Sequence, residues 1–264
     1  MNKRISIIGG GNLGTAIAEG LINSGFSLPE HILITRRNVK SLAALQKKGV
    51  LVSDDNQEAV RFADLVILAV KPFQASDILT KLQQSIEKRH VIVSVVTGFT
   101  IDQIAQSLAA DCTIVRAMPN TAIAIQQSMT CLSAANISVE QQRYIEDLFS
   151  QLGRVVWIDE KLMDAATVLG ACGTAYAMRY IRANIQGGIQ IGFDAATASL
   201  IAAQTVKGAA ELLLQKGAHP EQEIDKVTTP KGCTIAGLNE MEHQGFSSSL
   251  IKGIVASYDK IAKD

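Results

Sequence analysis

The chain has 264 residues, of which 47% are hydrophobic, 19% are charged and only 5% are aromatic. Lysine plus arginine and aspartate plus glutamate each number 25, so no net charge draws the chain to nucleic acid or to an anionic membrane. The apolar runs at residues 65–70 and 91–96 have the length of strands and are too short to cross a bilayer. We therefore expect a globular protein with an aliphatic core that binds neither nucleic acid nor membrane.

The first half of the chain alternates short β-branched runs with stretches of helical periodicity. Strands are expected at residues 5–8, 32–35, 65–69, 91–96 and 113–117, and helices at 13–23 and 39–48. Strands separated by helices predict right-handed βαβ units and a mostly parallel sheet. Runs at 129–133 and 155–158, with a helix through Tyr144 and Leu148 between them, add edge strands that close this domain at residue 160.

The second half has almost no strand signal and is rich in alanine. Residues 164–191 and 195–215 have the periodicity of two long helices, the second ended by Gly217, and two shorter helices follow a turn at 228–232. Alanine and glycine at helical spacing let helices approach closely, so we expect these helices to pack on one another and on a second chain. The sequence thus predicts a domain over 1–160, an all-α domain over 161–264, and a homodimer or higher homo-oligomer.

The N-terminus indicates the compartment of the protein, and the cysteine spacing indicates whether it binds a metal. Lys3 and Arg4 precede an apolar run, as in a signal peptide, but Gly9 interrupts the run and no small-residue cleavage site follows, so we expect a cytoplasmic protein. The cysteines form no CxxC pair and have no zinc-like spacing to a histidine, so we expect small buried side chains and no metal site. They are Cys112, Cys131, Cys172 and Cys233.

A glycine-rich segment follows the first expected strand and opens the first helix. It reads Gly9-Gly10-Gly11-Asn12-Leu13-Gly14 and fits GxGxxG, which in this context is typical of a Rossmann dinucleotide-binding domain. Gly9 would form the tight turn, Gly11 would admit a pyrophosphate, and Gly14 would let the helix pack on the strand. The pyrophosphate would lie against amides at the helix start. The expected fold is therefore an α/β Rossmann domain followed by an all-α C-terminal domain.

The end of the second strand indicates which nucleotide binds. Sites that prefer NAD place Asp or Glu there, whereas this chain has Thr35-Arg36-Arg37-Asn38. A carboxylate would repel a 2′-phosphate and guanidinium groups would bind one, so we expect NADP(H), with NAD as the alternative cofactor. A solvated loop whose two arginines bind no ligand is the alternative for this segment. Ala69-Val70-Lys71-Pro72 and Thr97 end two further strands, at the edge where such sheets bind ligands. On position alone, Lys71 is either a ligand contact or a surface lysine.

Several further segments are shared with one family of reductases. They are Asn56 with Glu58-Ala59-Val60, Arg116-Ala117-Met118-Pro119-Asn120-Thr121, Asp164-Ala165-Ala166-Thr167, the pair Gly187-Gly188, and residues 227–238. Together with the glycine loop and the Lys71 segment, they make the chain resemble Δ1-pyrroline-5-carboxylate reductases over nearly its whole length. The resemblance implies reduction of the small-molecule substrate 1-pyrroline-5-carboxylate to L-proline by NADPH, the last step of proline biosynthesis.

The resemblance also implies site residues. Thr35 and Arg36 would contact the adenosine ribose or its phosphate, Asn56 would lie on the adenine side, and Glu160 would contact the cofactor from the helical half. With the residues already discussed, the expected cofactor-binding set is Gly9, Gly11, Asn12, Leu13, Gly14, Thr35, Arg36, Arg37, Asn56, Ala69, Val70, Lys71, Pro72, Thr97, Asn120 and Glu160. The expected substrate-binding set is Thr229, Gly232, Cys233 and Thr234, with Thr234 beside the imine nitrogen.

The Thr229-Pro230-Lys231-Gly232 segment has the composition of a helix start, with Thr229 as N-cap and Pro230 in the first helical position. Amides of Gly232, Cys233 and Thr234 could then bind a substrate carboxylate, although an ordinary capped helix remains the alternative. The family usually has Ser-Pro-Gly-Gly here, and Ser-Gly-Ser-Gly-Pro-Ala-Tyr where this chain has Gly170-Ala171-Cys172-Gly173-Thr174-Ala175-Tyr176. Lys231 either adds a charge to the site or points into water.

The expected mechanism is hydride transfer to the carbon of a cyclic imine. A threonine hydroxyl is a poor acid, so we expect Thr234, the proposed catalytic residue, to hold the nitrogen while the proton comes from solvent or arrives on the substrate. A β-hydroxyacid dehydrogenase or related imine reductase is the alternative enzyme, but dehydrogenase chemistry uses a lysine where this chain offers only Arg179 or Arg182. A non-catalytic dinucleotide-binding protein is the alternative of another class.

Overall fold

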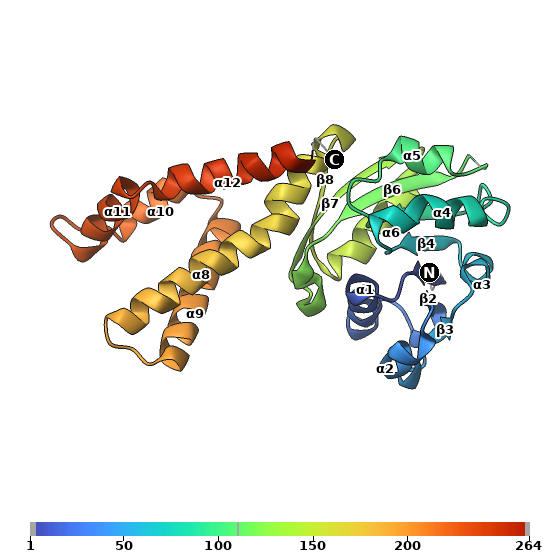
Figure 1. Ribbon diagram of the computed structural model, residues 1–264, viewed down its shortest axis with the longest axis horizontal. Helices are drawn as coiled ribbons and strands as arrows, with labels where there is room; N and C mark the ends of the chain where they lie inside the picture. The colour runs from blue at the N-terminus through green and yellow to red at the C-terminus, as the bar shows by residue number, and fades with distance from the viewer. Residues whose placement is uncertain (1–3, 110, 262–264) are drawn as a thin grey trace. The chain divides into compact units, whose positions relative to one another are not determined.

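The computed structural model describes residues 4–109 and 111–261 and divides into two compact units, Met1–Cys172 and Gly173–Asp264. The first unit contains one sheet with helices, and the elements described in the second, up to residue 261, are all helices (Figure 1). This architecture confirms the expected fold class. The first unit extends past residue 160 to Cys172, because Met163 and Val168 are buried against it.

The first unit is built on an eight-stranded sheet with the order β3-β2-β1-β4-β5-β6-β7-β8. All neighbouring strands are parallel except β6 and β7, so the sheet is mostly parallel, as expected. The expectation missed β3, because its three residues are half exposed and too short to show a periodicity. The strands are β1 (Ile5–Ile8), β2 (Ile32–Thr35), β3 (Leu51–Ser53), β4 (Leu65–Leu68), β5 (Val91–Ser94), β6 (Thr113–Met118), β7 (Ser128–Ala135) and β8 (Gly153–Trp157).

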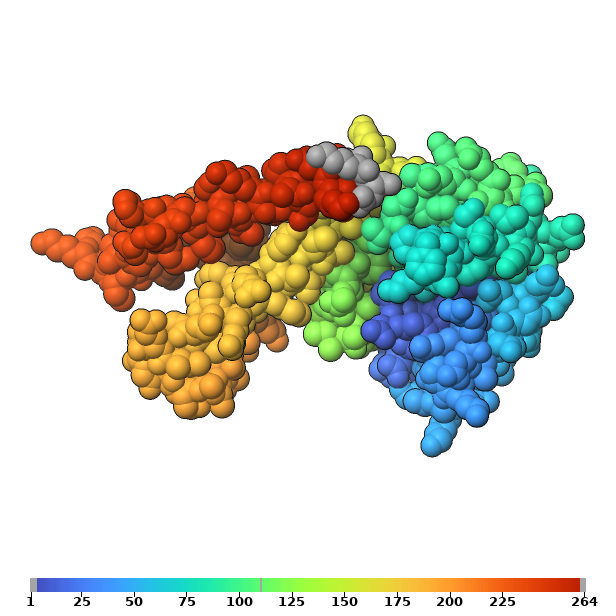
Figure 2. All heavy atoms as spheres, viewed as in Figure 1, coloured from blue at the N-terminus to red at the C-terminus, as the bar shows by residue number. Residues whose placement is uncertain are grey.

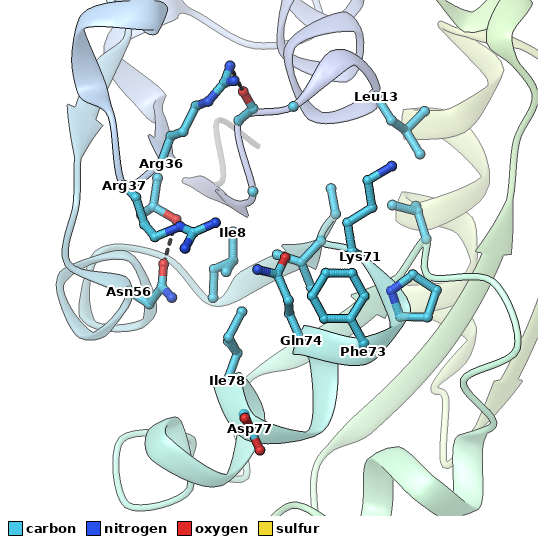
Figure 3. Close-up of a pocket in the computed structure, with 18 of the residues that line it drawn as sticks. Ile8, Leu13, Arg36, Arg37, Asn56, Lys71, Phe73, Gln74, Asp77 and Ile78 are labelled. Carbon is cyan, nitrogen blue, oxygen red and sulfur yellow. Dashed lines mark hydrogen bonds between the residues drawn. The ribbon is translucent and has the colours of Figure 1, made fainter.

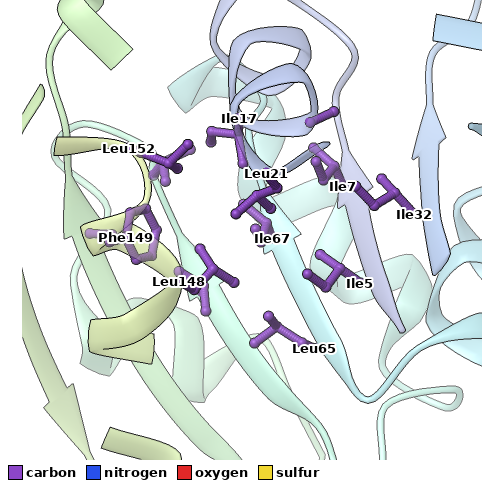
Figure 4. Close-up of a cluster of buried hydrophobic side chains, with 14 of the residues drawn as sticks. Ile5, Ile7, Ile17, Leu21, Ile32, Leu65, Ile67, Leu148, Phe149 and Leu152 are labelled. Carbon is purple, nitrogen blue, oxygen red and sulfur yellow. The ribbon is translucent and has the colours of Figure 1, made fainter. Parts of the chain in front are cut away.

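The central strands are buried on both faces, which explains their continuous apolar sequences. Side chains alternate between two cores, so that Ile5 and Ile7 join one and Ile8 joins the other. Helices α1 and α6 cover the first core (Figure 4), whereas α3, α4 and α5 cover the second. The helices of this unit are α1 (Asn12–Asn23), α2 (Ala43–Lys47), α3 (Asn56–Phe62), α4 (Pro72–Leu82), α5 (Ile101–Gln106), α6 (Val139–Ser150) and α7 (Met163–Ala166).

The helix expected over 164–191 is interrupted, which corrects the prediction from periodicity. A π-helical segment, η5 (Thr167–Cys172), separates α7 from the following helix. The Asn120 side chain donates from Nδ2 to the Gly170 carbonyl at 3.2 Å, so a side chain from another segment satisfies part of the widened turn. Alanine-rich periodicity could not reveal this contact, because the donor lies 50 residues away in the chain.

The second unit contains α8 (Gly173–Gln190), α9 (Ala195–Lys216), α10 (Pro220–Lys226), α11 (Cys233–His243) and α12 (Phe246–Ile261). Helices α8 and α9 lie side by side (Figure 1), and a Cβ added to Gly188 would lie 3.2 Å from the Ala198 Cβ, as expected for close helix packing. Tyr176 Oη and Ser257 Oγ, 2.6 Å apart, join α8 to α12. The expectation missed α10, which starts at Pro220 after the capping residue His219.

This helical unit has almost no interior of its own. Among its described residues only Ala198 and Ala202 are buried (this unit is coloured from gold to red in Figure 2). The large apolar side chains that remain exposed include Met178, Ile191, Leu200, Leu214, Val227, Ile251 and Val255. Within the described part of the chain, no helix is both long and apolar enough to cross a membrane.

Candidate functional site

A cavity of about 1280 Å³ opens at the carboxyl ends of β1, β2 and β4 (Figure 3). Parallel α/β sheets bind their ligands at this edge, beside the strand where the order of connections reverses. The lining includes most of the residues expected to hold the cofactor: Gly9, Gly11, Asn12, Leu13, Thr35, Arg36, Arg37, Asn56, Ala69, Val70, Lys71, Pro72 and Thr97. The structure therefore brings together five segments that are separated in the sequence.

The three glycines of the GxGxxG segment have different environments. Gly9 has φ +113°, and a Cβ there would lie 2.4 Å from the Ala69 carbonyl oxygen. A Cβ on Gly14 would lie 2.1 Å from the Gly9 carbonyl oxygen, so packing within the chain already requires both glycines. Gly11 has no atom within 4 Å of its Cβ position. Only Gly11 leaves a space that the protein itself does not fill, which fits the close approach of a pyrophosphate.

The start of α1 offers unpaired amides to this space. Gly11 is the N-cap and provides no side-chain cap, so the amides of Asn12, Leu13 and Gly14 have no acceptor within the helix. The positive end of the helix dipole lies at the same place. Free amides, an open glycine and the nearby cations Arg37 and Lys71 suit a ligand with linked phosphates. The residues present therefore fit a dinucleotide.

The end of β2 fixes the position of the glycine loop. The Thr35 carbonyl accepts hydrogen bonds from the amides of Gly9 at 3.2 Å and Gly10 at 2.7 Å. Thr35 Oγ1 donates to Asn56 Oδ1 at 2.6 Å, which joins β2 to the start of α3. Thr35 is only 2% exposed, so its side chain supports the cavity wall more than it faces solvent.

Sequence reasoning missed one wall of the cavity, which is formed by a face of α4. Gln74, Asp77, Ile78 and Lys81 line the cavity, and their spacing of three and four residues places them on one helix face. That spacing can be seen in the sequence, but these residues form no motif that would indicate ligand binding. Other lining residues outside the expected set are Ile8, Gly10, Asn38, Asp54, Phe73 and Val95.

Gly14, Asn120 and Glu160 were expected at the cofactor but do not line this cavity. Asn120 Oδ1 accepts from the Ala122 amide at 3.0 Å, and its Nδ2 holds the Gly170 carbonyl. Glu160 Oε1 accepts from the Ile101 amide at 2.7 Å and from Arg116 Nη1 at 3.0 Å. Arg116 is 3% exposed, so Glu160 neutralises a buried guanidinium.

A second candidate site lies in the helical unit, at the start of α11. The expected helix start at Thr229 and Pro230 is wrong, because the N-cap is Gly232 and the helix begins at Cys233. Residues 229–232 form a turn in which the Gly232 amide donates to the Thr229 carbonyl at 3.0 Å. Lys231 has φ +59°, a left-handed conformation that cannot continue a right-handed helix.

The turn changes which groups can bind an anion. The Gly232 amide is used within the turn, whereas Cys233, Thr234 and Ile235 occupy the first helical positions and their amides have no acceptor in α11. A Cβ on Gly232 would lie 2.5 Å from Thr229 Oγ1 and 3.0 Å from the Thr229 carbonyl oxygen, so a side chain there would crowd Thr229. Within residues 4–109 and 111–261, the Thr234 hydroxyl has no hydrogen-bond partner and remains available to a ligand.

The cysteines were expected to be buried, and only Cys112 fully meets that expectation. Cys112 is buried and Cys131 and Cys172 are half-buried, but Cys233 is exposed at the first position of α11. Burial raises the pKa of the Cys112 and Cys131 thiols, which keeps both protonated at neutral pH. The described residues contain no cluster of histidine, cysteine and acidic side chains that could hold a metal ion.

Two family models match the chain. One, described as NADP oxidoreductase coenzyme F420-dependent, covers residues 4–98. The other, described as pyrroline-5-carboxylate reductase dimerisation, covers residues 160–264. The first contains the glycine loop and the second contains the start of α11.

Full-length relatives share both parts. Pyrroline-5-carboxylate reductase 1 of Dictyostelium discoideum is 47% identical over 98% of this chain, which spans 49% of that relative. Pyrroline-5-carboxylate reductase 2 of the same organism is 43% identical over 99% of this chain and 93% of its own.

Solved structures agree with this relationship. A pyrroline-5-carboxylate reductase from Coxiella burnetii superposes with a TM-score of 0.92 at 30% identity, covering 100% of this chain and 98% of the other. A Plasmodium falciparum pyrroline carboxylate reductase with NADP bound gives a TM-score of 0.88 at 25% identity, covering 98% and 97%.

The glycine environments predict opposite effects for two similar substitutions. Gly11→Ala should leave stability unchanged, because Gly11 has φ −82° and open space, but should weaken NADPH binding tenfold or more by filling the space the pyrophosphate needs. Gly14→Ala should cost about 1–3 kcal/mol of stability through overpacking. Urea unfolding and NADPH titration measure the two effects. Normal NADPH affinity in Gly11→Ala would contradict this account of the loop.

The left-handed turn predicts that Lys231→Gly stabilises the protein. Glycine adopts this conformation without the steric cost that a Cβ causes, so stability should rise by roughly 0.5–1 kcal/mol after the entropy cost of glycine is included. The matched control is Gly217→Ala, since Gly217 has φ +62° and nothing near its Cβ position, and this change should destabilise. Unfolding at equal protein concentrations tests both. A loss of stability in Lys231→Gly would show that the lysine side chain stabilises the turn.

Proposed function

The chain belongs to the pyrroline-5-carboxylate reductase family, and we propose that it reduces 1-pyrroline-5-carboxylate to proline with NADPH. This would be the last step of proline biosynthesis. The observation that most supports the proposal is that the chain contains a dinucleotide cavity and a separate amide-rich helix start. Each feature lies in a part of the chain that matches a family model of its own.

The N-terminal unit would hold the cofactor. The amides of Asn12 and Leu13 would bind the pyrophosphate, Arg37 would meet the phosphorylated adenosine ribose, and the segments at Lys71 and Thr97 would line the nicotinamide half. When bound, NADPH supplies the hydride that reduces the imine. The protein would hold the cofactor in one orientation relative to the substrate. The entropy cost of aligning the two is then met on binding and not in the hydride-transfer step.

The start of α11 would bind the substrate carboxylate. The amides of Cys233, Thr234 and Ile235 and the positive end of the helix dipole favour an anion there. Thr229 and Gly232 would shape the turn that presents these amides, and Gly232 would act through its lack of a side chain rather than through its amide.

Thr234 would orient the imine nitrogen through its hydroxyl. An imine carbon accepts hydride far better when the nitrogen is protonated, but a threonine hydroxyl is too weak an acid to provide that proton. The proton would therefore come from solvent or arrive on the substrate. Thr234 would fix the nitrogen by a hydrogen bond, and most of the acceleration would come from proximity and orientation.

The exposed apolar surface of the helical unit supports a homodimer at minimum. The helical unit exposes many large apolar side chains and has almost no buried core, so a second copy would complete its interior. Helices in residues 164–215 would form the interface, and the match to a dimerisation model over 160–264 supports this assignment.

Pyrroline-5-carboxylate and NADPH test the reaction directly, by the rate of NADPH oxidation and by detection of proline. A β-hydroxyacid panel with NADP+ serves as the alternative, although α8 has no lysine for that chemistry. Turnover of the hydroxyacids without imine reduction would reject the proposal. Binding of NADPH without any turnover would favour a dinucleotide-binding protein.

Thr234→Val tests the role of the hydroxyl, because valine keeps the shape and removes only the hydrogen bond. Losing a hydrogen bond to a charged group costs roughly 1.5–3 kcal/mol, so kcat and kcat/KM should fall together by about ten- to hundredfold. NADPH affinity should stay unchanged. Steady-state kinetics and NADPH titration provide these values.

The control for this variant is Thr228→Val. Thr228 Oγ1 donates to the Ile224 carbonyl at 2.8 Å, so this change removes a structural hydrogen bond and should lower stability while leaving kcat nearly unchanged. Full activity in Thr234→Val would reject the catalytic assignment and leave the family membership intact.

The dimer is tested by mass in solution at micromolar concentration. Leu200→Glu should shift the protein toward monomer, since Leu200 is 70% exposed on α9 and a buried charge at an interface is costly. Val139→Glu is the matched control, because Val139 is 67% exposed at the first position of α6, outside the expected interface. A monomeric wild-type protein would refute the assembly.

A further inference from the structure

Two adjacent arginines, Arg36 and Arg37, line the dinucleotide cavity, but their side chains leave the end of β2 in different directions. The Arg36 amide donates to the Ser53 carbonyl at 3.0 Å, so pairing with β3 continues one residue beyond Thr35. Successive side chains of an extended strand point to opposite faces. In Figure 3 the Arg36 side chain runs toward the glycine loop, whereas the Arg37 guanidinium lies in the cavity near Ile8 and Asn56.

Arg36 is committed to Gly10. Its Nη1 donates to the Gly10 carbonyl at 2.8 Å, and its Cβ lies 3.4 Å from the position that a Gly10 Cβ would occupy. The Gly10 amide in turn donates to the Thr35 carbonyl at 2.7 Å. The end of β2 therefore binds both polar backbone groups of Gly10, one through the Thr35 main chain and one through the Arg36 side chain.

Arg37 makes no comparable hydrogen bond within the described residues. It is exposed, and within residues 4–109 and 111–261 it takes part in no hydrogen bond or ion pair, so its guanidinium donors remain available. Two carboxylates, Asp54 and Asp77, line the same cavity. They disfavour an added phosphate, so a cation is needed to bind one there.

We infer that Arg37 distinguishes NADPH from NADH by binding the 2′-phosphate, whereas Arg36 is a positioning residue that acts through Gly10. By holding the Gly10 carbonyl, Arg36 fixes the loop whose following amides meet the pyrophosphate, a group that both dinucleotides share. Arg36 therefore supports the two cofactors equally. This inference rests on the cofactor part of the proposed function and is independent of the imine substrate.

Calorimetric titration with NADP+ and NAD+ tests the division of roles, because the two ligands differ only in the 2′-phosphate. Arg37→Ala should weaken NADP+ binding by about ten- to hundredfold, with less than about a twofold change for NAD+. Arg36→Ala should weaken both by a similar factor, on the order of three- to tenfold, and keep their ratio within about twofold of wild type.

Conservative variants separate positioning from general loss of structure. Arg36→Lys keeps a donor for the Gly10 carbonyl and should restore binding of both ligands toward wild type. Arg37→Lys keeps a charge without paired donors and should retain part of the NADP+ preference. Lys40→Ala removes an exposed cation of the same connection that does not line the cavity, and should change neither affinity.

Loss of the NADP+ preference in Arg36→Ala, with the preference kept in Arg37→Ala, would overturn the inference, as would equal affinities of the wild type for NADP+ and NAD+. Should Arg36→Ala fail to fold, Arg36→Lys and Arg36→Gln decide the question by the same ratio. A wild type that prefers NADP+ through Arg37 but does not reduce the imine would reject the proposed function and leave this inference standing.

Discussion

The carbonyl of Thr35, at the end of β2, accepts the amides of Gly9 and Gly10, and the geometry of the cofactor cavity depends on this pair of hydrogen bonds. They draw the turn after β1 toward β2, while Gly9 passes so close to Ala69, directly after β4, that a side chain could not fit. The turn is thereby fixed between the two strands that flank β1. Because the turn cannot shift, the first amides of α1 keep one direction, and an anion can bind without first ordering the loop.

The two units differ in how they bury their apolar side chains. The α/β unit buries continuous apolar strands under helices on both faces and so has two cores of its own. The helical unit uses small residues that allow close packing of α8 on α9, and this leaves too few large side chains inside. Its large apolar residues face outward instead, where a second copy would cover them in the proposed dimer.

Charge at the carboxyl edge of the sheet is also arranged by tertiary contacts. Arg116 is buried within β6, and the cost of an isolated buried guanidinium is offset by Glu160, which also caps the amide of Ile101 at the start of α5. Glu160 therefore ties the segment after β8 to β6 and α5. Its contact with the cofactor remains an expectation from the resemblance, and the structure gives Glu160 a second role that sequence comparison alone would not suggest.

The sequence by itself determined the βα alternation, the glycine loop at β1 and the change to helices after β8. Each of these features follows from local periodicity or from the backbone freedom of glycine. Tertiary structure decided three other features. Helix α11 starts three residues later than expected, a π-helical segment precedes α8, and Arg36 binds within the protein whereas Arg37 stays free. Each depends on a hydrogen bond or a backbone conformation that composition does not encode: the left-handed Lys231, the Asn120 amide on Gly170, and the Gly10 carbonyl on Arg36. The sequence shows which polar groups are present at each position. Whether a given group remains free to bind a ligand depends on the hydrogen bonds that it forms with distant segments in the folded chain.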